Sequence, residues 1–199
     1  MSALDVAIID SGGANLASLR HALDRLGARS VVSSDAALIA AAPRVLLPGV
    51  GAAADAMARL RASGLDRLIP RLRAPLLGIC LGMQLLFDHS AEGDTACLGV
   101  MPGRIEKLQT APGLPVPHMG WNTLELRRED PLLAGVSRGD RLYFVHGFAA
   151  GPSEDTLASV FYGTELSAIV RHGNFRGVQF HPERSSAAGA RILRNFLSL

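Results

Sequence analysis

The segment with the clearest chemical potential holds a cysteine with a glycine two positions before it and another two positions after it. Cys80 stands where the apolar, strand-like run Leu76–Ile79 passes directly into a helix-like run. A sharp strand-to-helix turn needs residues without a Cβ, and it projects the side chain between them as a nucleophile. The helix N-terminus would favour a thiolate, the N–H group of Leu81 could donate to an oxyanion, and Gln84 would point to the same side. Taken alone, the pattern also fits a tight turn with an inert cysteine.

A cysteine nucleophile needs a histidine as its base, and the base needs an acceptor that fixes its tautomer. Only His181 has a carboxylate two residues away, that of Glu183, just past an apolar run over 175–180. A proline holds the turn between them, so both side chains can face Cys80, and we predict a Cys-His-Glu triad. For His146, a role as a hydrogen-bonded histidine of the core and a role in a functional site are equally consistent with the sequence. No pair of histidines has the spacing of metal ligands, so no metal site is predicted.

A glycine-rich loop after another apolar strand supplies the third part of the predicted site. Gly49, Val50 and Gly51 follow the run Val45–Leu47. Such a loop can turn its backbone N–H groups toward a ligand, as an oxyanion hole requires, although an ordinary glycine turn has the same composition. The second cysteine, Cys97, has no comparable context and is expected to be structural.

The elements that must position these residues differ between the two halves of the chain. Strand-like and helix-like pieces alternate in the first half, and short strand-like runs dominate after about residue 95. We predict an α/β fold with one mixed, mainly parallel central sheet flanked by helices, in a single domain over residues 1–199. The predicted strands are Leu4–Ile9, Val31–Val32, Val45–Leu47, Leu76–Ile79, Arg104–Leu108, Asn122–Leu126, Leu142–Val145, Leu157–Phe161, Ala168–Arg171 and Gly177–Phe180, and the predicted helices are Leu16–Leu26, one from about Asp35, Ala53–Leu72 and Ser186–Leu199.

Composition and charge exclude several classes of function. Lys and Arg number 20 against 18 Asp and Glu, and the formal net charge of +2 is too small to suggest a nucleic-acid or membrane-surface protein. Lys107 is the only lysine and has no glycine cradle before it, so neither P-loop nor Schiff-base chemistry is expected. The most apolar uncharged stretch, 74–87, is shorter than the roughly 20 residues that span a bilayer. We expect a cytoplasmic protein with no cofactor, no metal and no nucleic-acid or membrane partner.

Together these motifs resemble the class I glutamine amidotransferases, whose signature joins the elbow cysteine and a glutamine four residues later to a glycine-rich oxyanion strand and a late His-Pro-Glu. Within that family the chain resembles the glutaminase subunits of imidazole glycerol phosphate synthases. It departs from their pattern at Gly147 and Phe148, where a hydroxyl residue and a tyrosine are common. The resemblance is carried by Ile9–Leu16, Pro48–Gly51, His118–Asn122, Tyr143–His146 and Gln179–Glu183.

The resemblance implies a flavodoxin-like amidotransferase fold and hydrolysis of L-glutamine to glutamate and ammonia through a thioester. It also implies that the ammonia passes to a partner, the cyclase subunit of imidazole glycerol phosphate synthase, a (β/α)8 barrel that acts on a phosphorylated ribulosyl intermediate in histidine biosynthesis. The residues expected to bind glutamine are Gly49, Val50, Gly51, Leu81 and Gln84. The face expected to contact the partner comprises His118, Met119, Gly120, Trp121, Asn122 and Arg184.

Two rival functions remain open on the sequence alone. A stand-alone cysteine hydrolase of γ-glutamyl peptides would use the same triad and would turn over well without a partner. A non-enzymatic interaction subunit with a decayed site would show no acylation of its thiol. Glutamine hydrolysis measured with and without the cyclase distinguishes these functions from the expected one.

Overall fold

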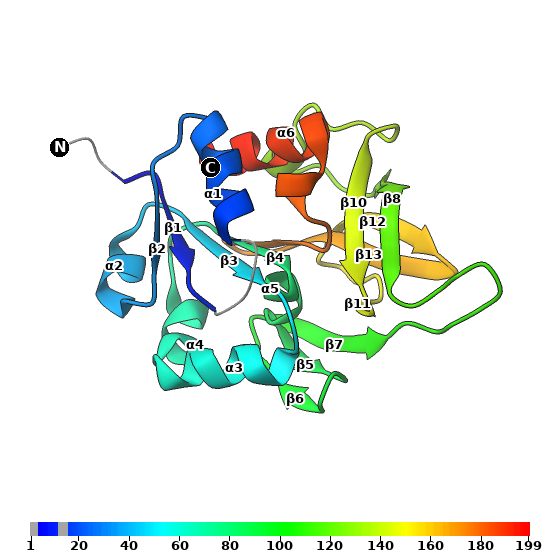
Figure 1. The fold of residues 1–199 in the computed structure, drawn as a ribbon, viewed down its shortest axis with the longest axis horizontal. Coiled ribbons are helices and arrows are strands. Elements are labelled where there is room, and N and C mark those ends of the chain that lie inside the picture. The colour runs from blue at the N-terminus through cyan, green and yellow to red at the C-terminus, as the bar shows by residue number, and fades with distance from the viewer. Residues whose placement is uncertain (1–3, 12–15) are drawn as a thin grey trace.

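A computed structural model describes residues 4–11 and 16–199 (Figure 1). Its largest sheet has eight strands in the order β2-β1-β3-β4-β14-β13-β12-β9. The first five strands in this order are parallel, and the last three join antiparallel, which confirms the predicted mixed, mainly parallel sheet. The strands are β1 (Val6–Ile9), β2 (Ser30–Ser33), β3 (Val45–Gly49), β4 (Leu76–Cys80), β9 (Glu125–Leu126), β12 (Thr156–Tyr162), β13 (Thr164–His172) and β14 (Phe175–Val178).

Helices cover both faces of this sheet, as predicted (Figure 1). Leu23 of α1 and Phe196 of α6 are fully buried in the core on one face, and Ile39 of α2 and Leu60 of α3 in the core on the other. Strands covered on both sides read as continuous apolar runs, which is why β1 and β4 were predictable. Within 4–11 and 16–199, no helix is long and apolar enough to cross a membrane. The helices are α1 (Leu16–Arg25), α2 (Ala36–Ala41), α3 (Ala53–Ala62), α4 (Leu65–Leu68) and α6 (Ser186–Leu197).

The predicted helix Ala53–Leu72 is interrupted. Gly64 follows α3 with a φ of 72°, a left-handed conformation that favours glycine and ends a helix. The chain then forms α4 and a 3-10 turn over Ile69–Arg71. Apolar periodicity continues across these pieces, so the sequence pattern resembled one helix.

The strand-rich half does not join the large sheet as a whole, contrary to the prediction of one sheet. β8 and β10 form a separate antiparallel ribbon, seen at the right of Figure 1, and four further strands form a small sheet. The predicted strand Asn122–Leu126 is divided at the buried Leu124, because β8 pairs with β10 whereas β9 pairs with β12. These strands are β5 (Phe87–Ser90), β6 (Thr95–Ala96), β7 (Met101–Lys107), β8 (His118–Thr123), β10 (Arg141–His146) and β11 (Phe148–Ala150).

The topology brings three loops together at the carboxyl edge of the parallel strands. β4 pairs with β3 on one side, where Gly49 lies opposite Cys80, and with β14 on the other. The ribbon is joined to this edge, since the N–H group of His181 donates a 2.9 Å hydrogen bond to the carbonyl oxygen of Tyr143. This is the edge at which open α/β sheets bind ligands. Residues 12–15, part of the motif Ile9–Leu16, lie outside the described residues.

Candidate active site

Cys80 occupies a strained turn between β4 and α5 (Leu81–Gln84). Its φ of 54° and ψ of −112° lie outside the regions that residues with a side chain favour. The flanking glycines are sterically required: a Cβ on Gly82 would lie 1.7 Å from the carbonyl oxygen of Leu47, and one on Gly78 2.6 Å from that of Gly82. The sharp turn predicted from the glycine spacing is therefore present.

The helix after this turn is shorter than the sequence suggested. α5 has four residues, and the chain enters β5 at Phe87. A single turn aligns few peptide dipoles, so the helix N-terminus stabilises a thiolate less than expected. Nearer groups surround the sulfur: Gln179 Nε2 lies 3.9 Å from Cys80 Sγ, and the carbonyl oxygen of Val145 lies 3.7 Å away.

His181 and Glu183 lie just beyond β14, where Pro182–Arg184 form a 3-10 turn. His181 Nδ1 is 2.9 Å from Glu183 Oε1, and because a carboxylate only accepts, Nδ1 carries the hydrogen and Nε2 is left for Cys80. Burial disfavours a charged His181, but hydrogen bonds with Cys80 and Glu183 outweigh it and raise the pKa of the imidazole well above its usual value. The arrangement favours an imidazolium beside the sulfur.

A pocket of about 250 Å³ lies over the thiol. Gly49 does not line it; a Cβ there would lie 3.0 Å from the backbone nitrogen of Gly82, so this glycine lets β3 approach the elbow closely. Glu183 lies behind His181 and is also absent from the lining. The predicted residues that do line the pocket are Val50, Gly51, Cys80, Leu81, Gln84 and His181.

Sequence reasoning missed Glu92, the carboxylate in the pocket lining. It lies in the turn between β5 and β6, where its Oε2 accepts a 2.9 Å hydrogen bond from the N–H group of Ala53 at the start of α3. Its neighbours Gly93 and Asp94 look like an ordinary turn, and no spacing connects them to the elbow. The other lining residues that were not predicted as site residues are Pro117, Val145, His146, Gly147 and Phe148.

Comparison with known proteins shows to which family this site belongs. A family model described as "Glutamine amidotransferase class-I" matches residues 7–199. The chain belongs to the class I glutamine amidotransferase family. The amidotransferase is 55% identical to "Imidazole glycerol phosphate synthase subunit HisH" of Xanthomonas euvesicatoria, over 195 residues and 98% of both chains. A protein of the same name from Xylella fastidiosa (strain Temecula1) is 54% identical over 195 residues and 98% of both chains.

Solved structures agree with this fold. A structure described as a glutamine amidotransferase has a TM-score of 0.76 at 20% identity, covering 97% of both chains. Another glutamine amidotransferase, from Thermotoga maritima, has a TM-score of 0.70 at 15% identity, covering 100% of the chain described here and 98% of its own. At these identities the likeness concerns the fold alone.

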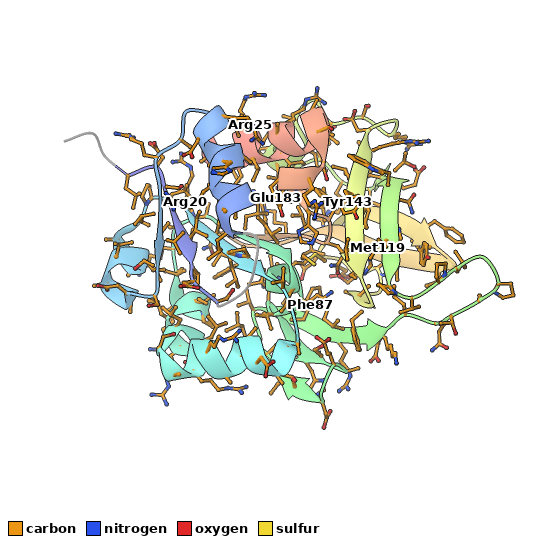
Figure 2. All side chains as sticks on the ribbon, in the orientation of Figure 1. Arg20, Arg25, Phe87, Met119, Tyr143 and Glu183 are labelled. Carbon is orange, nitrogen blue, oxygen red and sulfur yellow. The ribbon has the colours of Figure 1, made fainter. Side chains whose placement is uncertain are left out.

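The ribbon beside the pocket presents an exposed aromatic face to solvent. Met119 and Trp121 of β8 are 63% and 49% exposed. The Trp121 ring meets Tyr143 of β10 edge-on at 5.7 Å, and the Arg184 guanidinium lies 5.4 Å from the centre of the Tyr143 ring. In Figure 2, Met119 is labelled on β8 and Tyr143 on β10. We call this group, Met119, Trp121, Tyr143 and Arg184, the outer face.

His118 was predicted on the partner face, but the structure places it inside the protein. Side chains alternate along a strand, so His118, Gly120 and Asn122 lie on the opposite side of β8 from the outer face. His118 is only 3% exposed, and its ring stacks on Tyr162 with the ring centres 4.0 Å apart. Gly120 and Asn122 are half-buried. A partner docking on the outer face would therefore not touch the His118 side chain.

A wider surface cavity of about 670 Å³ lies along residues 126–138. Its described lining consists of arginines, acidic and apolar residues, without a cysteine or histidine. The smaller pocket is lined by both Cys80 and His181, so it is the candidate for the chemistry of the amidotransferase despite its smaller volume.

Proposed function

We propose that this amidotransferase is the glutaminase subunit of an imidazole glycerol phosphate synthase, a single domain of residues 1–199 that works in the cytoplasm. The observation that carries the proposal is the arrangement of Cys80 and His181 at one pocket, with Glu183 hydrogen-bonded to His181 behind it, in a chain 55% identical to a subunit of that enzyme. The reaction converts glutamine and water to glutamate and ammonia. The ammonia then passes to the cyclase partner.

In the proposed mechanism, the Cys80 thiolate attacks the carboxamide carbon of glutamine, and the carbonyl oxygen becomes an oxyanion. Val50 and Leu81 line the pocket near the sulfur, and their backbone N–H groups are the candidates to hold this charge. His181 gives its Nε2 proton to the departing nitrogen, ammonia leaves and a thioester remains. Water that loses a proton to His181 then attacks the thioester carbon, glutamate leaves, and the thiolate and imidazolium are restored.

The pocket also offers groups for the amino-acid end of glutamine. The Glu92 carboxylate suits the α-ammonium group, because an ionised pair in a small pocket gives both affinity and orientation. Gln84 also lines this pocket and provides a side-chain amide that can form a hydrogen bond with glutamine. Among the described lining residues there is no Lys or Arg, so backbone N–H groups must meet the α-carboxylate.

The proposed cyclase subunit would dock on the outer face. Exposed Met, Trp and Arg side chains are the types that dominate binding energy at protein interfaces. β10 connects this face to the pocket, since the Tyr143 carbonyl accepts from the His181 backbone N–H group and the Val145 carbonyl oxygen lies 3.7 Å from Cys80 Sγ. Binding at the outer face therefore acts on the same strand that touches the nucleophile and the base.

The test of the proposed function is the rate of glutamine hydrolysis, measured for the chain alone and with its cyclase partner and the partner's ligand bound. Hydrolysis without an acceptor would waste ammonia, so we expect the complex to be faster by about a thousandfold, which corresponds to roughly 4 kcal/mol. The loop with Gly49, Val50 and Gly51 is the proposed switch, because glycines permit a peptide flip at low cost. Equal rates would instead support the stand-alone hydrolase, and no thiol acylation in either state would support a non-enzymatic subunit.

Replacement of Arg184 by alanine should weaken the response to the partner more than it affects the chain itself. The substitution removes an exposed cation suited to a carboxylate on the partner, and we expect the Kd for the cyclase to rise about tenfold. Alkylation of Cys80 by iodoacetamide in the isolated chain should change little. Arg73→Ala, an exposed arginine before the amino end of β4, is the matched control and should leave the Kd unchanged. Loss of alkylation with an unchanged Kd would contradict the assignment.

A further inference from the structure

Two buried histidines form a hydrogen-bonded pair on the inner side of the ribbon. His118 and His146 lie opposite each other in the strand register, and His118 Nδ1 is 3.0 Å from His146 Nε2. At one end of the pair, His146 Nδ1 lies 2.9 Å from the carbonyl oxygen of Phe148. At the other end, Asn122 Nδ2 lies 3.5 Å from His118 Nε2. The triad does not use either ring.

The positions of the hydrogens in this chain follow from its ends. The Phe148 carbonyl can only accept, so His146 Nδ1 carries a hydrogen, and in a neutral ring Nε2 then accepts. His118 must therefore donate from Nδ1, and its Nε2 accepts from the Asn122 amide. Burial keeps both rings neutral and lowers the pKa of each to about 4. A second proton on either ring would place two donors against each other.

The same Phe148 carbonyl is shared with the catalytic pocket. Gln84 Nε2 donates to it over 2.8 Å and also donates to Gln179 Oε1 over 3.0 Å. Because its nitrogen faces these two acceptors, Gln84 has its Oε1 left to accept from a ligand in the pocket it lines. Gln179 in turn directs its Nε2 toward Cys80 Sγ, 3.9 Å away. A reversed Gln84 amide would set oxygen against oxygen at both contacts.

We propose that His118 and His146 are positioning residues for the glutaminase reaction, which hold the Phe148 carbonyl so that Gln84 presents its oxygen to glutamine and Gln179 presents an N–H group to the nucleophile. This inference rests on the proposed function for its catalytic consequence. Its structural basis is the continuous chain of donors and acceptors from Asn122 to the sulfur. His118, which the sequence motif placed at the partner contact, thus acts on the pocket through His146 and the Phe148 carbonyl.

Two substitutions at His118 separate a polar role from a packing role. His118→Asn keeps a donor near the position of Nδ1 but loses the aromatic ring that stacks on Tyr162 and Phe144, whereas His118→Phe keeps the stacking and loses the donor. In the complex with the cyclase, we expect His118→Phe to raise the KM for glutamine about tenfold with little change in kcat, because a buried acceptor on His146 loses its donor. His118→Asn should stay within about threefold of wild type. Equal effects, or a larger effect of the asparagine, would overturn the proposal.

The tautomers provide a measurement that needs neither a variant nor glutaminase activity. Nitrogen-15 NMR of the ¹⁵N-histidine-labelled full chain at pH 7 should show both His118 and His146 neutral with the hydrogen on Nδ1. A charged ring, or a hydrogen on Nε2 of either residue, would overturn the positioning role even if every kinetic result agreed. If instead the wild-type complex hydrolyses no glutamine while both tautomers are as expected, the proposed function fails and the hydrogen-bonded pair stands.

Discussion

Replacement of Cys80 by alanine should abolish glutamine-dependent synthesis by the complex, with a loss on the order of 10⁴-fold or more, while ammonia-dependent synthesis continues. The reason is that glutamine hydrolysis and the use of ammonia are proposed to take place on two different chains. Cys80 supplies the sulfur that forms the thioester, and no other step of the proposed glutaminase reaction can begin without it. In the proposed function the acceptor chemistry belongs to the cyclase, which would accept external ammonia directly. The two rates are measured in the same preparation with either glutamine or an ammonium salt as the nitrogen source.

Cys97→Ser is the matched control for this experiment. Burial raises the pKa of the Cys97 thiol to about 11, so it is protonated at neutral pH and is a poor nucleophile. Glutamine-dependent synthesis by Cys97→Ser should therefore stay close to that of the wild type. A glutamine-derived thioester found on Cys97, by mass spectrometry of the trapped intermediate, would show that the nucleophile is assigned to the wrong cysteine.

The parts of the site that the sequence predicted are those encoded in short contiguous segments. The glycines around Cys80 indicate a sharp turn, and part of its steric demand is local: a Cβ on Gly78 would lie 2.6 Å from the carbonyl oxygen of Gly82, four residues later. His181 and Glu183 are two residues apart across a proline, so their contact needs no knowledge of the rest of the fold. The alternation of apolar runs and helices likewise predicts a parallel sheet, which brings these segments to one edge.

Glu92 was not predicted because its role depends on tertiary packing. It reaches the pocket from a turn between β5 and β6, and these strands belong to a small sheet that the sequence did not reveal. In the sequence, the segment that forms β5 follows a short apolar run after Gln84, which continues the helix-like pattern that begins at the elbow. Pairing with β7 and with β6 makes this segment a strand.

The orientation of β8 reverses the usual rule for a half-buried strand. Apolar side chains normally face the core, which would bury Met119 and Trp121 and expose His118. The structure does the opposite, because His118 finds a hydrogen-bond partner in His146 and a stacking partner in Tyr162. A buried polar side chain is stable when it is paired in this way. The apolar residues left outside form the surface that we propose for the cyclase.

Replacement of His181 by alanine should lower the glutaminase rate of the complex far more than replacement of Glu183 by glutamine, by about 10⁴-fold against about 10²-fold. In the proposed mechanism His181 carries the proton to the leaving nitrogen and takes one from water, and among the described residues that line the pocket it is the histidine that is hydrogen-bonded to Cys80. Glu183 only orients that ring through its 2.9 Å hydrogen bond. Steady-state assays in the presence of the cyclase measure both losses.

The smaller loss expected for Glu183→Gln follows from how His181 is held. Its backbone N–H group is bonded to the Tyr143 carbonyl, and its own carbonyl accepts a 2.7 Å hydrogen bond from the Ser185 hydroxyl. The ring therefore stays near Cys80 without the carboxylate, and the glutamine amide oxygen can still accept from Nδ1. A rate for His181→Ala close to that of the wild type would remove the histidine from the triad. Equal and complete losses in both variants would show that the charge of Glu183 is required for proton transfer and does more than orient the ring.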